Sequence, residues 1–94
     1  MKRLLLLVLL LPAGCRRAPL SAEDCRRILD RIVDLELAER GFRDPALAER
    51  RKNELRALFS PDLAACVGRR VRPDALACVA RATSAEDLSH HCLR

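Results

Sequence analysis

The chain has 94 residues, with 18 Lys and Arg against 13 Asp and Glu, and its formal net charge is +5. A chain of this length forms one small domain at most. Trp and Tyr are absent, and Phe42 and Phe59 are the only aromatic residues. The chain therefore lacks the aromatic platforms on which nucleic-acid bases stack, and we expect no nucleic-acid partner.

The N-terminus has the order of features that an export signal requires. Two positive charges, Lys2 and Arg3, precede the unbroken apolar run Leu4–Leu11, and small residues follow up to Cys15. The run is too short to span a bilayer, which takes about 20 apolar residues. Residues 1–14 are therefore predicted to be a signal peptide that is removed.

The four residues at the end of this leader resemble the lipobox of bacterial lipoproteins. Ala13, Gly14 and Cys15 match its last three positions, whereas Pro12 stands where an aliphatic residue is usual. The resemblance implies cleavage before Cys15, lipidation of Cys15 with palmitate among its acyl chains, and a place at the periphery of a cell-envelope membrane. That membrane surface faces either the periplasm or the outside of the cell. Secretion without lipid is the alternative.

The cysteine count agrees with export. If Cys15 carries lipid, four cysteines remain, and an even number in an oxidising compartment predicts two disulfides. A domain of about 80 residues is only marginally stable without such cross-links.

After a tether over residues 15–20, Ser21 and Asp24 predict the capped start of a first helix. Its apolar residues recur at helical spacing, and its charged residues, Arg31 among them, lie mostly on a solvated face. Gly41 suits the left-handed position that ends a helix. We expect Phe42 to fold back onto the core.

The pair Asp44-Pro45 predicts the start of a second helix. Its apolar contacts are expected to be Leu47, Leu55, Leu58 and Phe59. The basic run at positions 50–52 interrupts them and is interpreted as a solvated face, with a docking site for an acidic partner as the alternative.

Three shorter helices follow in the pattern. Ser60-Pro61 predicts the cap of a third helix that ends at Gly68, and a basic loop over positions 69–72 leads to a fourth helix after Pro73. Ser84 caps the last helix. No strand pattern is present, so we predict an all-α domain over residues 21–94, a bundle of four or five short helices held by two disulfides.

Four cysteines allow three pairings. If the first two helices form an antiparallel hairpin, Cys25 lies near Cys66, and Cys78 and Cys92 flank the turn at Thr83-Ser84. Geometry thus favours Cys25–Cys66 with Cys78–Cys92. The competing arrangement is Cys66–Cys78 with Cys25–Cys92.

His90, His91 and Cys92 are candidate metal ligands, with Cys78 as a possible fourth. Neighbouring helical residues point about 100° apart, and export favours thiol oxidation, so two exposed histidines are the competing interpretation. No nucleophile sits in a recognisable catalytic context, and a small helical domain leaves little room for a substrate pocket. We expect neither an enzyme nor a cofactor, and no small-molecule substrate.

The overall plan resembles the small exported four-cysteine helical proteins and lipoproteins, without assigned function, of GC-rich Gram-negative bacteria. The resemblance lies in the leader, in Cys25 and in the spacing from Cys66 to Cys92. It implies a lipid-anchored protein with a non-enzymatic binding or envelope-structural role, whose partner would be an envelope protein. A secreted disulfide-stapled effector or inhibitor is the second interpretation, and a metal-binding protein is the third.

Overall fold

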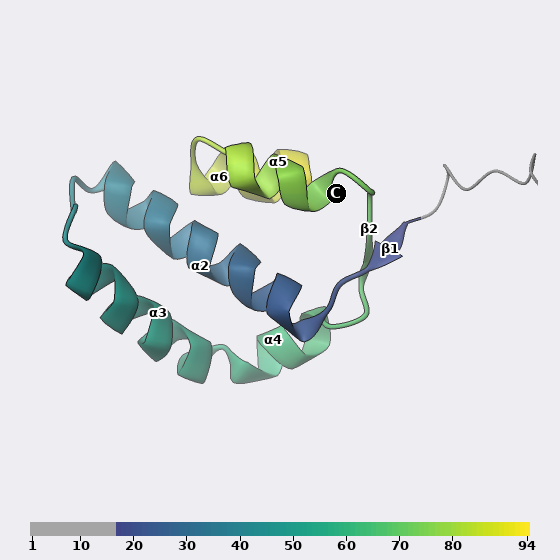
Figure 1. Ribbon diagram of the computed structural model, residues 1–94, viewed down its shortest axis with the longest axis horizontal. Helices are drawn as coiled ribbons and strands as arrows, with labels where there is room; N and C mark the ends of the chain where they lie inside the picture. The colour runs from purple at the N-terminus through teal and green to yellow at the C-terminus, as the bar shows by residue number, and fades with distance from the viewer. Residues whose placement is uncertain (1–16) are drawn as a thin grey trace, which may run out of the picture.

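The computed structural model describes residues 17–94 (Figure 1). Its helices are α2 (Ala22–Glu39), α3 (Pro45–Leu58), α4 (Ser60–Cys66), α5 (Ala75–Arg81) and α6 (Ala85–Asp87), which continues into a wider π-helical turn, η1 (Leu88–Cys92). The predicted all-α class and the two disulfides are confirmed. The predicted signal peptide at residues 1–14 and the predicted lipidation at Cys15 lie outside the described residues.

Helix α2 is the centre of the domain. Helices α3 and α4 lie along one side of it, and α5 and α6 lie along the other (Figure 1). The dense part of the core is on the α5 side. Its buried residues come from α2, β2, α5 and η1 and from the residues that directly follow β1 and α5: Leu20, Cys25, Ile28, Leu35, Val71, Ala75, Val79, Ala82, Leu88 and Cys92.

Local capping chemistry sets the ends of α2. The Ser21 hydroxyl accepts a hydrogen bond from the Asp24 N–H at 3.0 Å, and the Asp24 carboxylate accepts one from the Ser21 N–H at 2.9 Å. Gly41 has a φ of +83°. The N–H groups of Gly41 and Phe42 donate to the carbonyls of Ala38 and Leu37, so the last carbonyls of the helix are satisfied. Both predicted ends are confirmed.

The expected burial of Phe42 is wrong, because its side chain is 51% exposed. The chain reverses through Gly41 and must leave α2 immediately to reach Asp44, the cap of α3, whose carboxylate accepts from the Ala46 N–H at 3.0 Å. Phe42 therefore lines a surface pocket beside the turn, with residues of both α2 and α3, and does not belong to the core.

Helix α3 contributes no buried residue. Leu58 is 69% exposed and Phe59 is 40% exposed, so these two expected core contacts are wrong. Only Phe59 separates α3 from α4, and its N–H still donates to Leu55 while its carbonyl accepts from Leu63. This continuity leaves no turn before Ser60, so the predicted cap at Ser60 is also wrong and Phe59 occupies the cap position without a side-chain hydrogen bond.

A short pair of strands closes the domain beside the start of α2. Ala18 and Pro19 of β1 (Ala18–Pro19) lie opposite Val71 and Arg70 of β2 (Arg70–Val71). The Leu20 N–H donates to the Arg69 carbonyl, the Gly68 N–H donates to the Leu20 carbonyl, each at 2.8 Å, and the Leu20 side chain is buried. Residues 18–20 are therefore part of the packed fold, which corrects the predicted tether and basic loop.

Candidate functional site

The four cysteines within the described residues pair with one another. Cys25 at the start of α2 is bonded to Cys66 at the end of α4, with 6.1 Å between Cα atoms, and Cys78 of α5 is bonded to Cys92 of η1, with 5.4 Å. This is the pairing that helix geometry favours. Disulfides persist in oxidising compartments, so the pair indicates an exported protein.

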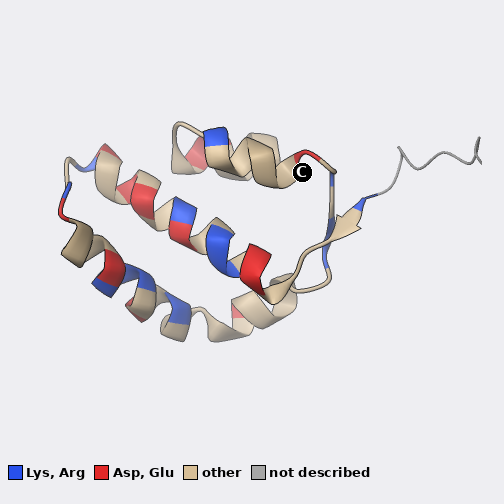
Figure 2. Ribbon diagram, viewed as in Figure 1, with Lys and Arg blue, Asp and Glu red and all other residues tan. Residues whose placement is uncertain are grey.

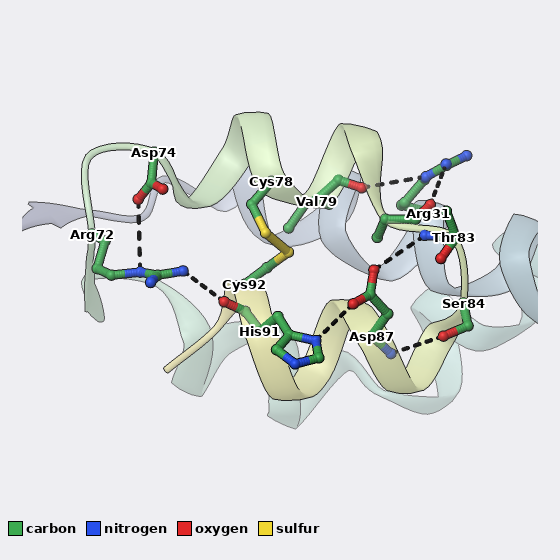
Figure 3. The surroundings of a disulfide bond; sticks show 11 residues. Arg31, Arg72, Asp74, Cys78, Val79, Thr83, Ser84, Asp87, His91 and Cys92 are labelled. Carbon is green, nitrogen blue, oxygen red and sulfur yellow. Dashed lines mark hydrogen bonds and ion pairs between the residues drawn. A yellow bond between two sulfur atoms is a disulfide. The ribbon is translucent and has the colours of Figure 1, made fainter.

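The candidate metal ligands at the C-terminus are not brought together. Cys92 is buried, and its sulfur is bonded to Cys78 (Figure 3). The exposed His91 ring lies with Nδ1 2.6 Å from an Asp87 oxygen, and His90 Nε2 lies 3.9 Å from Glu86. Within residues 17–94 no group of three or more His, Cys, Asp or Glu side chains could hold a metal ion. The disulfide therefore removes Cys78 and Cys92 from the set of metal ligands that the sequence offered.

Asp87 is instead a structural centre for the last helix. Its N–H donates to the Ser84 hydroxyl at 2.9 Å, and its carboxylate accepts from the Thr83 N–H at 3.3 Å (Figure 3). The bond from the Thr83 N–H, followed by the bond with His91, lowers the pKa of the Asp87 carboxyl. The cap at Ser84 is thus confirmed. His91 hydrogen-bonds to this same carboxylate at the surface and therefore belongs to the cap of the last helix.

The basic run Arg50-Arg51-Lys52 is only partly a solvated face. Arg50 is exposed, and Arg51 pairs with Glu54 on its own helix at 3.3 Å. The Lys52 side chain is only 14% exposed, and its ammonium lies 3.0 Å from Asp34 of α2. Arg56, one turn later, donates through its guanidinium to the Asp30 carboxylate. These two ion pairs hold α3 to α2.

An open apolar groove of about 470 Å³ lies between α2, α3 and α4. Two ion pairs and one disulfide hold α3 and α4 to α2. Because α3 has no buried residue, apolar side chains do not fill the space between α3 and α2, and the groove stays open. The sequence predicts little room for a substrate pocket, and it did not predict this open groove on the surface. The groove has an apolar floor and three charged residues: Cys25, Ile28, Leu29, Ile32, Leu55, Phe59, Leu63 and Cys66, with Glu36, Arg51 and Asp62.

Sequence reasoning missed this groove because it assigned the apolar residues of both helices to one shared core. The signal was present in the long interval between Leu47 and Leu55 of the second helix, which cannot supply an apolar stripe along its full length. A helix with such an interval contacts its neighbour at polar positions and leaves apolar side chains in water.

No family model, no curated protein and no solved structure matches the chain. Among the helices of residues 17–94, none is both long enough and apolar enough to cross a membrane.

Proposed function

We propose that this protein is exported, is anchored to a membrane by lipid on Cys15, and has a non-enzymatic binding or structural role at the cell envelope. The observation that supports the proposal best is the cysteine pairing. Two disulfides use four of the five cysteines, Cys25 with Cys66 and Cys78 with Cys92. The fifth cysteine, Cys15, is left over at the one position where the leader resembles a lipobox.

The anchor would determine which end of the domain lies nearest the membrane. Ala18, where the packed fold begins, is three positions after Cys15, and three residue steps span at most about 10 Å. Lipid on Cys15 would therefore hold the β1–β2 end at the membrane surface. The turn between α2 and α3, at the opposite end of α2, would point away from it (Figure 1).

The binding role is supported by the apolar surface that the fold leaves in water. Leu58 and Phe59 are exposed at the junction of α3 and α4, and Phe59 also lines the groove. Exposed apolar patches mark protein contacts in many soluble domains. The partner that we propose is another protein of the envelope.

Metabolic labelling with palmitate tests the anchor. The wild-type protein is expected to incorporate label and to sediment with membranes, and Cys15→Ser is expected to lose both properties. Pro12→Leu, which restores an aliphatic residue three positions before Cys15, is the matched control and retains the label. An unlabelled, soluble wild-type protein outside the cell would overturn the anchor and favour the secreted effector or inhibitor.

A further inference from the structure

The strand pair gathers positive charge at one end of the molecule. Pairing of β1 with β2 places Arg70 opposite Pro19, and the Arg70 guanidinium reaches along β1 to donate to the Arg17 carbonyl at 3.1 Å. Arg69 directly precedes Arg70 in the chain, and all three arginines are exposed. Basic residues thus lie both directly before β1 and at the start of β2 (Figure 2).

No acidic side chain neutralises this cluster within the described residues. Arg17, Arg69 and Arg70 make no ion pair there, whereas four arginines elsewhere do: Arg27 pairs with Glu23, Arg51 with Glu54, Arg56 with Asp30 and Arg72 with Asp74. Residues 1–16 contain no Asp or Glu and add Arg16. The end of the domain nearest Cys15 is therefore a concentrated cationic surface.

An apolar side chain adjoins the cluster. Val67 is 47% exposed and precedes Arg69 by two residues, at the end of α4. Exposed arginines beside an exposed aliphatic residue suit the headgroup region of a bilayer, where cations meet phosphates and a short apolar side chain meets the upper acyl region.

We propose that Arg17, Arg69 and Arg70, with Val67, form a face that binds the phosphates of anionic phospholipids. This inference rests on the proposed lipid anchor, because lipid on Cys15 holds this face within reach of the bilayer. Each basic residue near an anionic surface favours the bound orientation by about fivefold. The cluster therefore fixes the domain with β1 and β2 against the membrane and the groove-bearing helices standing away from it.

Paramagnetic relaxation in nanodiscs tests the orientation. The acylated protein, extracted from membranes and verified by intact mass, is placed in discs that carry a gadolinium-chelating lipid. One set of discs is phosphatidylcholine alone and the other contains phosphatidylglycerol. With phosphatidylglycerol, the amide signals of Val67, Arg69 and Arg70 are expected to lose most of their intensity, while those of Gly41 and Phe42 at the far end of α2 retain it.

The double variant Arg69→Glu/Arg70→Glu is expected to reduce the population of this orientation at least about 25-fold, so its signals match those in phosphatidylcholine. Salt at about 1 M, where the screening length is about 3 Å, is expected to do the same. Arg43→Glu/Arg50→Glu is the matched control, since it reverses two exposed charges away from the strands and should behave as wild type.

The outcomes separate the two proposals. If the intact mass shows no acyl chains, the lipid anchor is overturned, and the proposed membrane face, which depends on the anchor, is overturned as well. An acylated protein whose Gly41 and Phe42 signals keep the same intensity in both kinds of disc, or the same intensity in the Arg69→Glu/Arg70→Glu variant as in wild type, overturns the anionic-lipid face and leaves the anchor proposal intact.

Discussion

Arg31 of α2 donates through Nη2 to the carbonyl of Ala82 at 2.9 Å and through Nε to the carbonyl of Val79 at 3.4 Å (Figure 3). The Val79 carbonyl lies in the last turn of α5 and also accepts from the Ala82 N–H at 3.3 Å, whereas the Ala82 carbonyl belongs to the residue that follows the helix. The sequence placed Arg31 on a solvated face. In the fold it is a half-buried cap that joins the central helix to α5.

Replacing Arg31 by Met keeps the apolar stem of the side chain but removes the donor to the Ala82 carbonyl and leaves the Val79 carbonyl with the Ala82 N–H alone. Loss of hydrogen bonds to a charged group is expected to lower the free energy of unfolding by about 1–3 kcal/mol. Urea denaturation measures the change. Arg27→Met is the control on the same helix: its exposed pair with Glu23 makes a cost above about 1 kcal/mol unexpected, and equal losses in the two variants would contradict the capping role.

The two disulfides are expected to contribute unequally to stability. Cys25–Cys66 closes a separation of 41 residues and Cys78–Cys92 one of 14. In the chain-entropy account these loops correspond to about 4 and about 3 kcal/mol. Paired Cys→Ala variants should therefore show the larger loss for Cys25→Ala/Cys66→Ala in equilibrium unfolding. A larger loss from Cys78→Ala/Cys92→Ala would show that packing around η1, and not loop length, sets the order.

Acid is expected to weaken the fold through two helix-start carboxylates. Hydrogen bonds from the Ser21 N–H and hydroxyl lower the pKa of Asp24, and the Thr83 N–H, followed by His91, lowers the pKa of Asp87. An unfolded Asp titrates near pH 3.9. In the window below that value the unfolded state binds more protons than the folded state, so stability is complete above about pH 4 and is lost as the pH falls through the lowered folded values.

Urea midpoints measured between about pH 6 and pH 2 test this sign. Asp24→Asn/Asp87→Asn should be less stable than wild type near neutral pH and should lose less on acidification. Asp62→Asn is the control, because this exposed carboxylate accepts no hydrogen bond within residues 17–94. If the double variant loses stability on acidification as steeply as wild type, groups other than Asp24 and Asp87 cause the loss.

Gly41 is expected to be required for its backbone conformation and not for lack of space. Its φ is +83°, and a Cβ there would meet no atom within 4 Å. Gly41→Ala should therefore lower stability by about 1–2 kcal/mol through backbone strain alone. Gly41→Asn should cost less, because Asn tolerates the left-handed region. Thermal unfolding compares the two, and a larger loss for Asn would be inconsistent with a conformational cause.

The features that sequence predicted correctly depend on residues close together in the chain. Ser21 with Asp24, Asp44 before Pro45, and Ser84 with Asp87 each form a cap within four positions. The cysteine pairing followed from helix lengths and one assumed hairpin. Such features are decided by local hydrogen bonds and by chain reach, which a sequence displays directly.

The features that sequence missed depend on which surfaces meet. Arg31 was placed in solvent because its carbonyl partners lie 48 and 51 positions away. Leu58 was placed in the core because its helix was assumed to pack by its apolar side chains. The two-residue strand β1 carries no alternating pattern, and its pairing depends on the turn at Gly68 that brings Arg70 beside it.

The central claim is that this chain folds outside the reducing cytoplasm, where its sulfur atoms bond in pairs. Alkylation of the protein taken directly from cells, followed by peptide mass mapping without reduction, tests it most directly. We predict peptides linked through Cys25–Cys66 and through Cys78–Cys92, with none of these four thiols alkylated. A chain that retains Met1, is found in the cytoplasm and is alkylated at all four positions would contradict the claim.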